Sequence, residues 1–268
     1  MMKMHLPHRV ALAAAVLCLA ACSQDSPTET TADTASAALP VAMELGPTLT
    51  AYHWRLESAV DSAGQAIAAL FPGPENRLGL EFASGRLGVT GGCNRIGAGF
   101  QLVEVSKLQL GPATSTMMGC PPPLAAADEA IASFLSGTLQ AEVQGDARAP
   151  VLRLAAVDGR ILDFKGTPTP ETRFGGPGTL AFLEVSPEPC EAPAASATCL
   201  KVRDRNFDEH GLRSGEPGEW RALPGGIEGY ATSPGEQQVV RVKRFETAGA
   251  EPVVHFVFDM VVESVTVQ

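Results

Sequence analysis

Short stretches of alternating apolar and polar residues, separated by turn residues, fill most of the chain from residue 51 onward. Residues 78–82 alternate Leu and Phe with Gly and Glu, the turn Ala83-Ser84-Gly85 follows, and residues 87–89 resume the alternation. A period of two is typical of strands that bury one face. A second hairpin is predicted at residues 151–164, because Asp158-Gly159 accepts the positive φ of a type I′ turn. The pattern therefore restricts the fold to β-rich structure with short connections.

One helix is predicted after a run of three prolines. Apolar residues recur at helical intervals between Leu124 and Leu139. Asp128 and Glu129 lie in the early turns, where the helix dipole favours acidic side chains. The first folded domain is therefore predicted to be α+β and mostly β.

Composition divides the chain into five parts. Residues 1–21 are a predicted signal segment, and residues 22–50, rich in Ser, Thr, Ala and acidic residues, are a predicted disordered tether. Residues 51–165 form the first domain. Residues 166–178 are dense in Gly and Pro and are predicted to be a linker to a small, mainly β domain at residues 179–268.

The start of the chain is typical of a bacterial lipoprotein. Lys3 and Arg9 precede an apolar run that ends at Cys22, and the run is too short for the ~20 residues that span a bilayer. Small residues before a cysteine suit lipoprotein processing, so Cys22 is predicted to be acylated and to anchor the chain in the membrane. Ordinary secretion is the alternative. Ser23, where an Asp would favour retention at the inner membrane, predicts the outer membrane, with the protein facing the periplasm.

The charge balance excludes one class of partner. The chain has 20 Lys and Arg against 30 Asp and Glu, and the signal segment carries two of the basic residues, which leaves a net charge of −12 after processing. Nucleic acid is therefore not expected as a partner. Broad adhesion to anionic lipid is disfavoured for the same reason.

Besides Cys22, the predicted lipidation site, four cysteines lie after the signal, in what the predicted location makes an oxidising compartment, and they allow three pairings. Pairing Cys93 with Cys120 and Cys190 with Cys199 keeps each disulfide inside one predicted domain. In the chain-entropy model the two loops stabilise the fold by about 3.5 and 2.7 kcal/mol. Free buried thiols and a metal site are the alternatives, although the chain lacks the C-x-x-C and H-x-x-x-H spacings of zinc sites.

Two segments are candidates for a ligand-contacting loop. Gly91-Gly92-Cys93-Asn94 is a tight reversal after a strand, and Thr114-Ser115-Thr116 offers hydroxyl groups before the helix. Asn94 and Thr116 are the candidate contacts. The alternative is local structure, because Gly and Asn accept positive φ and Ser and Thr often satisfy nearby backbone groups.

Metal and catalytic motifs are incomplete. Residues 204–208 carry oxygen side chains at positions one, three and five of a calcium loop, but Glu209 stands where the loop needs Gly, and Gly215 where it needs Glu. A solvated acidic loop is predicted instead. The chain has no G-x-S-x-G and no H-E-x-x-H motif, so we predict no catalytic residue, no metal, no cofactor and no enzyme activity.

Four ordered landmarks between Trp54 and Phe164 resemble the META domain, the family of the heat-shock lipoprotein HslJ. They are Trp54-Arg55-Leu56, Gly91-Gly92-Cys93-Asn94, Thr116-Met117-Met118-Gly119-Cys120 and Leu162-Asp163-Phe164. The resemblance implies a curled, mostly antiparallel sheet with one helix, similar to the cracked barrel of secretion pilot lipoproteins. It also implies a link to heat shock, novobiocin tolerance or secretion.

The rest of the chain is similar to an uncharacterised domain that often follows META in bacterial lipoproteins. The matching residues are Val185, Pro189-Cys190, Cys199-Leu200-Lys201-Val202-Arg203, Ile227-Glu228-Gly229-Tyr230 and Val239-Val240-Arg241-Val242. This likeness assigns neither a substrate nor a catalytic residue.

The sequence therefore predicts a non-catalytic, stress-related envelope lipoprotein that binds a protein or a cell-wall component. One alternative is carriage of a small apolar ligand in the mouth of the curled sheet. The other is hydrolysis by side chains that only the fold would bring together.

Overall fold

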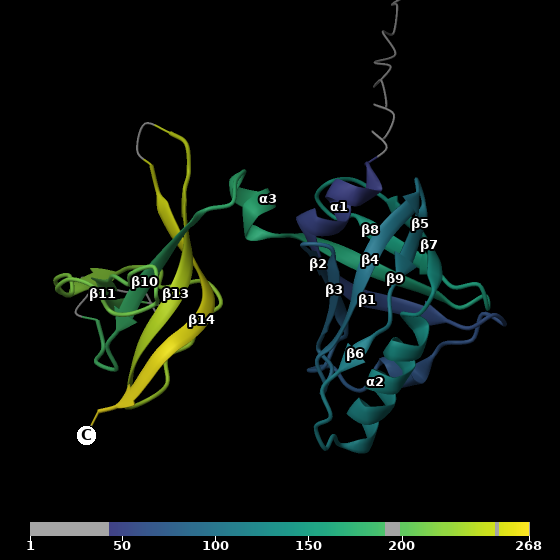
Figure 1. The fold of residues 1–268 in the computed structure, drawn as a ribbon, viewed down its shortest axis with the longest axis horizontal. Helices are drawn as coiled ribbons and strands as arrows, with labels where there is room; N and C mark the ends of the chain where they lie inside the picture. The colour runs from purple at the N-terminus through teal and green to yellow at the C-terminus, as the bar shows by residue number, and fades with distance from the viewer. Residues whose placement is uncertain (1–42, 191–198, 250–251, 268) are drawn as a thin grey trace, which may run out of the picture. The chain divides into compact units, whose positions relative to one another are not determined.

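The computed structural model describes residues 43–190, 199–249 and 252–267. The predicted signal segment, the lipidation site Cys22 and most of the predicted tether lie outside these residues. The described residues form two β-sheets, each of which is treated by itself (Figure 1). The prediction of an α+β, mostly β fold is confirmed.

Within residues 43–190, eight antiparallel strands close into a barrel. In order around the ring they are β3 (Arg86–Thr90), β2 (Gly79–Ala83), β1 (Tyr52–Val60), β9 (Ile161–Pro168), β8 (Val151–Ala155), β7 (Thr138–Gln144), β5 (Lys107–Leu110) and β4 (Ile96–Glu104). The predicted hairpins are β2–β3 and β8–β9. A two-strand pairing between β4 and β6 (Thr114–Ser115) extends the sheet beyond the ring.

The pairing of β3 with β4 closes the ring, so the expected curled sheet is a closed barrel. The first part of β4 pairs with β3, from Ile96 to Gly99, and its second part pairs with β5, from Phe100 to Glu104. Within the ring, one long strand thus pairs with two neighbours in succession. Closure leaves fewer unpaired backbone groups at the sheet edges.

The barrel interior is filled by apolar side chains. Trp54, Phe134 and Phe164 are each at most 1% exposed. On β1 buried and exposed residues alternate from Tyr52 to Leu56, as the period of two predicts, and a bulge after Leu56 shifts the pattern. The indole nitrogen of Trp54 donates a hydrogen bond of 2.9 Å to the carbonyl oxygen of Leu49, which satisfies its polar atom inside the core.

The tether prediction for residues 22–50 is wrong at its end, because a helix begins there. Helix α1 (Leu45–Ala51) packs against β2 and β7 and buries Leu49 completely. Leu45 and Leu49 are four residues apart and face the core together. Pro47 lies in the first turn of α1, where its missing N–H has no intrahelical partner to lose.

Helix α2 (Pro122–Phe134) is shorter than predicted. The expectation ran to Leu139, but Gly137 adopts φ +69° and the chain turns there into β7. Pro122 and Pro123 occupy the first turn, where their fixed φ suits a helix start. The one-turn 3-10 helix η1 (Ala68–Leu70) packs against α2.

The segment predicted as a linker, residues 166–178, contains ordered structure. Strand β9 continues to Pro168, and helix α3 (Pro170–Phe174) follows. The side chain of Thr169 accepts a hydrogen bond from the backbone nitrogen of Thr172, and Gly175 ends the helix at φ +76°. The Pro and Gly residues here are therefore helix start and stop signals. No helix among the described residues is long and apolar enough to cross a membrane.

The described residues after 178 form an antiparallel sheet of five strands. In order they are β12 (Arg221–Leu223), β11 (Leu200–Arg205), β10 (Thr179–Val185), β13 (Glu236–Glu246) and β14 (Val254–Thr266). The core lies on one face, where Leu183, Val202, Val240 and Val242 are fully buried. The prediction of a second, mainly β part is confirmed.

Candidate functional site

Two disulfides join the four cysteines as neighbours along the chain. Cys93 is bonded to Cys120, with 6.1 Å between the Cα atoms, and Cys190 to Cys199, with 5.7 Å. This is the nearest-neighbour pairing, one of the three that the sequence left open. The first disulfide links the turn after β3 to the segment that enters α2, and this region holds both candidate ligand contacts.

The carboxylate of Asp128 holds the turn against the helix. Its Oδ1 accepts a hydrogen bond of 3.1 Å from the backbone nitrogen of Cys93. Its Oδ2 accepts bonds of 2.7 Å from the backbone nitrogen and 3.0 Å from the side-chain nitrogen of Asn94. Asp128 is only 6% exposed, so these three bonds form away from water and satisfy the carboxylate. Asp128 therefore anchors the turn.

Two glycines allow this close approach. Gly91 has φ +78°, and a Cβ there would lie 2.0 Å from the carbonyl oxygen of Arg77. A Cβ at Gly92 would lie 2.4 Å from Oδ1 of Asp128. The Gly-Gly pair is thus required by backbone conformation at the first position and by contact with the carboxylate at the second.

Asn94 and Thr116 bind each other. The side-chain oxygen Oδ1 of Asn94 accepts hydrogen bonds of 3.0 Å from Oγ1 of Thr116 and 2.8 Å from the backbone nitrogen of Met118. Oγ1 of Thr116 accepts a further bond of 3.0 Å from the backbone nitrogen of Arg95. Because the loops use these polar atoms themselves, the structure favours the structural turn over the ligand-contacting loop.

Two apolar side chains beside this hydrogen-bond network are exposed to solvent. Met117 is 99% exposed and Met118 is 56% exposed, although Thr116 and Cys120 on either side are tied to the rest of the barrel. We call residues 116–120 the methionine loop. Its backbone is fixed at both ends, while the Met117 side chain is almost fully exposed and the Met118 side chain is about half exposed.

The family model of the META domain matches residues 47–169. This part of the chain is a META domain. The match begins inside α1 and ends just after β9, so it covers the closed barrel and the methionine loop. The resemblance drawn from the four sequence landmarks is confirmed, whereas the likeness of the second domain to a companion of META stays a prediction.

One solved structure and the curated proteins complete the comparison. The NMR structure of a protein from Burkholderia xenovorans is 21% identical, with a TM-score of 0.41, and the match covers 51% of this chain and 96% of that one. No curated protein matches the chain significantly.

The META domain also places a set of metal-ligand types together. The sulfur atoms of Cys93 and Cys120 and a carboxylate oxygen of Asp128 lie within 4.8 Å of one another. Zinc is bound by thiolates, and the disulfide removes both of them. The cluster therefore serves as a structural link between the turn and α2.

The partial calcium motif spans the end of β11 and the turn that follows it. Oδ1 of Asp208 accepts hydrogen bonds of 2.9 Å from the backbone nitrogens of His210 and Leu212. Asp204 instead accepts a bond of 3.0 Å from Arg221. The two carboxylates are engaged by different partners, and the predicted loop holds only for residues 206–208, because Asp204 and Arg205 belong to β11.

Apolar side chains fill the interior of the META domain, and a groove of about 460 Å³ lined by Leu56, Leu70, Phe71 and Leu78 borders this core. Leu108, Leu152 and Leu162 are fully buried inside the barrel, together with the aromatic side chains named above. An apolar ligand would have to displace side chains packed at the density of a protein core.

One titratable pair on the barrel surface has shifted pKa values. Nδ1 of His53 lies 3.3 Å from a carboxylate oxygen of Glu81. The hydrogen bond to Glu81 raises the pKa of His53 above 6.5, and the same bond lowers the pKa of Glu81 below 4.5. Both side chains are about half exposed, so this ion pair adds little stability.

Sequence reasoning missed the role of Asp128 and the exposure of Met117 and Met118. Asp128 was assigned to the favourable end of the helix dipole, but its side chain is buried. A signal existed, because Asp128 lies three residues before Ile131 and next to Ala127, on the stripe that the helix buries. An acid on an apolar stripe needs hydrogen-bond partners.

Proposed function

We propose that this protein is a non-catalytic lipoprotein of the bacterial cell envelope that acts in a stress response by binding a protein partner through the methionine loop. Cys22 would anchor it to the outer membrane, with the META domain in the periplasm. The META match supports a stress-related, lipoprotein-type role. The start of the sequence supports the anchor.

The observation that carries the proposal is the exposure of Met117 and Met118 on a fixed backbone. Methionine is enriched at the centre of protein interfaces and adapts to irregular apolar surfaces. A loop that is ordered before binding loses less entropy when the complex forms. The methionine loop therefore combines an adaptable contact surface with a rigid support.

The hydrogen bonding of the region supports a binding role over catalysis. Asn94, Thr116 and Asp128 lie in the region of the disulfide, and they hydrogen-bond to one another or to the local backbone. A catalytic site would need polar groups directed at a substrate. Here the polar groups support two apolar side chains instead.

Crosslinking in intact bacterial envelopes tests the partner. The full-length protein and a Met117→Ser, Met118→Ser double variant would be crosslinked chemically before and after heat or antibiotic stress, and the products identified by mass spectrometry. The control is Val157→Ser, which removes a 94% exposed apolar side chain elsewhere on the same barrel.

We expect a discrete crosslinked partner with the wild type and with Val157→Ser, and at least a tenfold loss with the double variant. No partner under stress, or equal crosslinking by the double variant, would refute the proposal. The anchor is tested separately by labelling with palmitate, which should reach the wild type and not Cys22→Ala.

A further inference from the structure

Trp220 lies on the surface of the second sheet, and the guanidinium group of Arg203 contacts its ring. It is 37% exposed. The guanidinium carbon of Arg203 lies 4.4 Å from the ring centroid, and Nζ of Lys201 lies 5.8 Å from it. Lys201 and Arg203 are two residues apart on β11, so both extend from the same face of the sheet. The indole ring is therefore supported by cation–π contacts.

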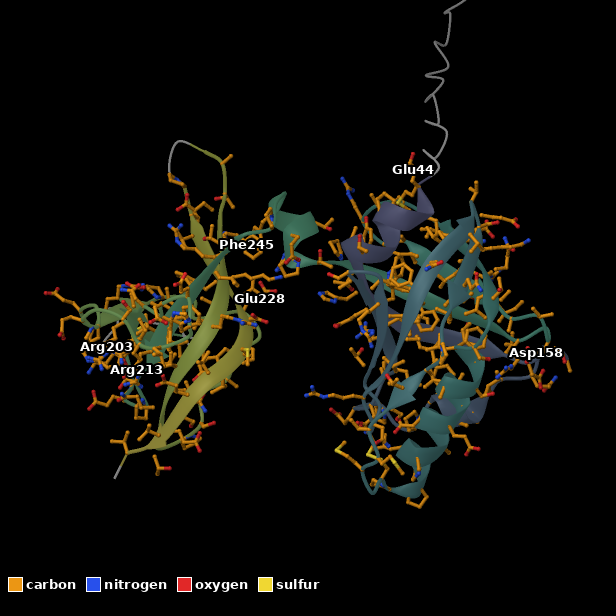
Figure 2. All side chains as sticks on the ribbon, in the orientation of Figure 1. Glu44, Asp158, Arg203, Arg213, Glu228 and Phe245 are labelled. Carbon is orange, nitrogen blue, oxygen red and sulfur yellow. A yellow bond between two sulfur atoms is a disulfide. The ribbon has the colours of Figure 1, made fainter. Side chains whose placement is uncertain are left out.

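A buried carboxylate fixes the supporting guanidinium. Glu184 on β10 is directly opposite Arg203 on β11, and its side chain is 4% exposed. It accepts hydrogen bonds of 2.8 Å from Nε and 3.0 Å from Nη2 of Arg203. A bidentate pair of this kind fixes the guanidinium plane. Figure 2 labels Arg203 on this sheet. The carboxylate of Glu184 thus holds the guanidinium of Arg203, which in turn contacts the indole ring of Trp220. We call these three residues the indole platform.

A groove of about 600 Å³ lies beside the platform. Polar side chains of both signs line it, among them Glu188, Lys201 and Arg221. Lys201 is paired with Glu188, and Arg221 with Asp204. Since the neighbouring acids neutralise the cations, the groove does not select an anion. It offers hydrogen-bond donors and acceptors next to a flat aromatic surface.

We propose that the indole platform and this groove bind the sugar units of a neutral polysaccharide. One face of a pyranose ring presents C–H groups, which pack against an aromatic ring, while the hydroxyl groups at its rim need donors and acceptors. The groove supplies both kinds of contact, and its volume lies within the range of about 300–1,000 Å³ typical of ligand sites. This site is separate from the methionine loop and would hold the second domain on an envelope polysaccharide.

Intrinsic fluorescence tests the proposal directly, because the chain has two tryptophans and the other one, Trp54, is 1% exposed. Purified full-length protein would be titrated with the tetramer of N-acetylglucosamine. We expect a saturable change in emission at millimolar sugar. Trp220→Leu should remove that change, keep the emission of Trp54 and weaken binding at least tenfold when measured by calorimetry.

A matched pair of arginine variants tests the support of the ring. Arg203→Lys removes the bidentate contact under Trp220 and should weaken binding about tenfold. Arg244→Lys is the control, because Arg244 pairs with Glu246 and lies opposite Thr179, at the other end of β10 from Glu184, and it should bind as the wild type does.

Several results would overturn the proposal. They are no saturable response of the wild type, equal binding by Trp220→Leu, or a change in Trp220 emission with phosphatidylglycerol vesicles but not with the sugar. Circular dichroism checks that the variants fold. Should Trp220→Leu not fold, saturation-transfer NMR on the wild type decides, because the sugar protons must then receive magnetisation from the protein.

Discussion

The buried carboxylate of Asp128 accepts hydrogen bonds from both the backbone and the side-chain nitrogen of Asn94. The two residues are 34 positions apart, and the contact joins α2 to the turn after β3. The same Asn94 side chain accepts a bond from the backbone of Met118. One carboxylate thereby sets the position of the loop that we propose to bind a partner.

Replacing the carboxylate should destabilise the META domain. In the wild type the nitrogen donors of Cys93 and Asn94 face a charged carboxylate, whereas in Asp128→Asn they would face a neutral amide. Loss of hydrogen bonds to a buried charged group lowers the free energy of unfolding by about 2–3 kcal/mol. Urea unfolding measures the change. The neighbouring Glu129→Gln, on an exposed side chain, should stay within about 0.5 kcal/mol of the wild type. Equal stability of the two variants would show that the hydrogen bonds have no structural role.

Removal of the first disulfide should lower stability and release the methionine loop. In the chain-entropy model the loop closed by Cys93 and Cys120 contributes about 3.5 kcal/mol. The Cys93→Ala, Cys120→Ala double variant should therefore unfold at lower urea concentration, and hydrogen exchange at Met118 should become faster. Unchanged exchange there would show that the hydrogen bond to Asn94 is enough to fix the loop without the sulfur bridge.

Alanine substitutions at two glycines distinguish the cost of backbone strain from the cost of steric contact. Gly91 and Gly85 both have positive φ, but a Cβ at Gly91 would meet the carbonyl oxygen of Arg77, whereas one at Gly85 meets no described atom within 4 Å. Gly85→Ala should cost about 1 kcal/mol for the left-handed conformation alone. Gly91→Ala should cost about 3 kcal/mol, because strain and collision add. Thermal unfolding of both variants measures the difference, which should vanish if the backbone at Gly91 can relax.

The pair of His53 and Glu81 should stabilise the barrel in a limited pH range. The raised pKa of His53 stabilises the fold fully below pH 6.5, and this contribution is lost as the pH rises through the folded value. The lowered pKa of Glu81 stabilises it above pH 4.5, and that contribution is lost as the pH falls through the folded value. The contribution is therefore greatest between about pH 4.5 and 6.5.

The variant His53→Gln tests this window. Both groups are about half exposed, so solvent screening limits the effect to a few tenths of a kcal/mol. The free energy of unfolding of the variant should fall below that of the wild type near pH 5.5 and match it above pH 8. A difference that is the same at all pH values would point to lost packing instead of lost charge.

The sequence by itself determined the strands, the hairpins and the family of the first domain. Alternation in residues 78–89 and 151–164 predicted β2–β3 and β8–β9, whereas the Cys93–Cys120 pairing was one of the pairings that the sequence left open. These features depend on residues close together in sequence, whose spacing and turn chemistry limit the backbone directly.

Only the tertiary structure decided which distant groups meet. It closed the ring through β3 and β4, buried Leu49 of a helix that composition assigns to a tether, and brought Asp128 to Asn94 and Arg203 to the ring of Trp220. Such contacts depend on how whole strands and helices pack, and the local pattern of either partner is compatible with several neighbours. The physical reason is that burial and hydrogen-bond satisfaction apply to the folded chain as a whole, not to any single segment of it.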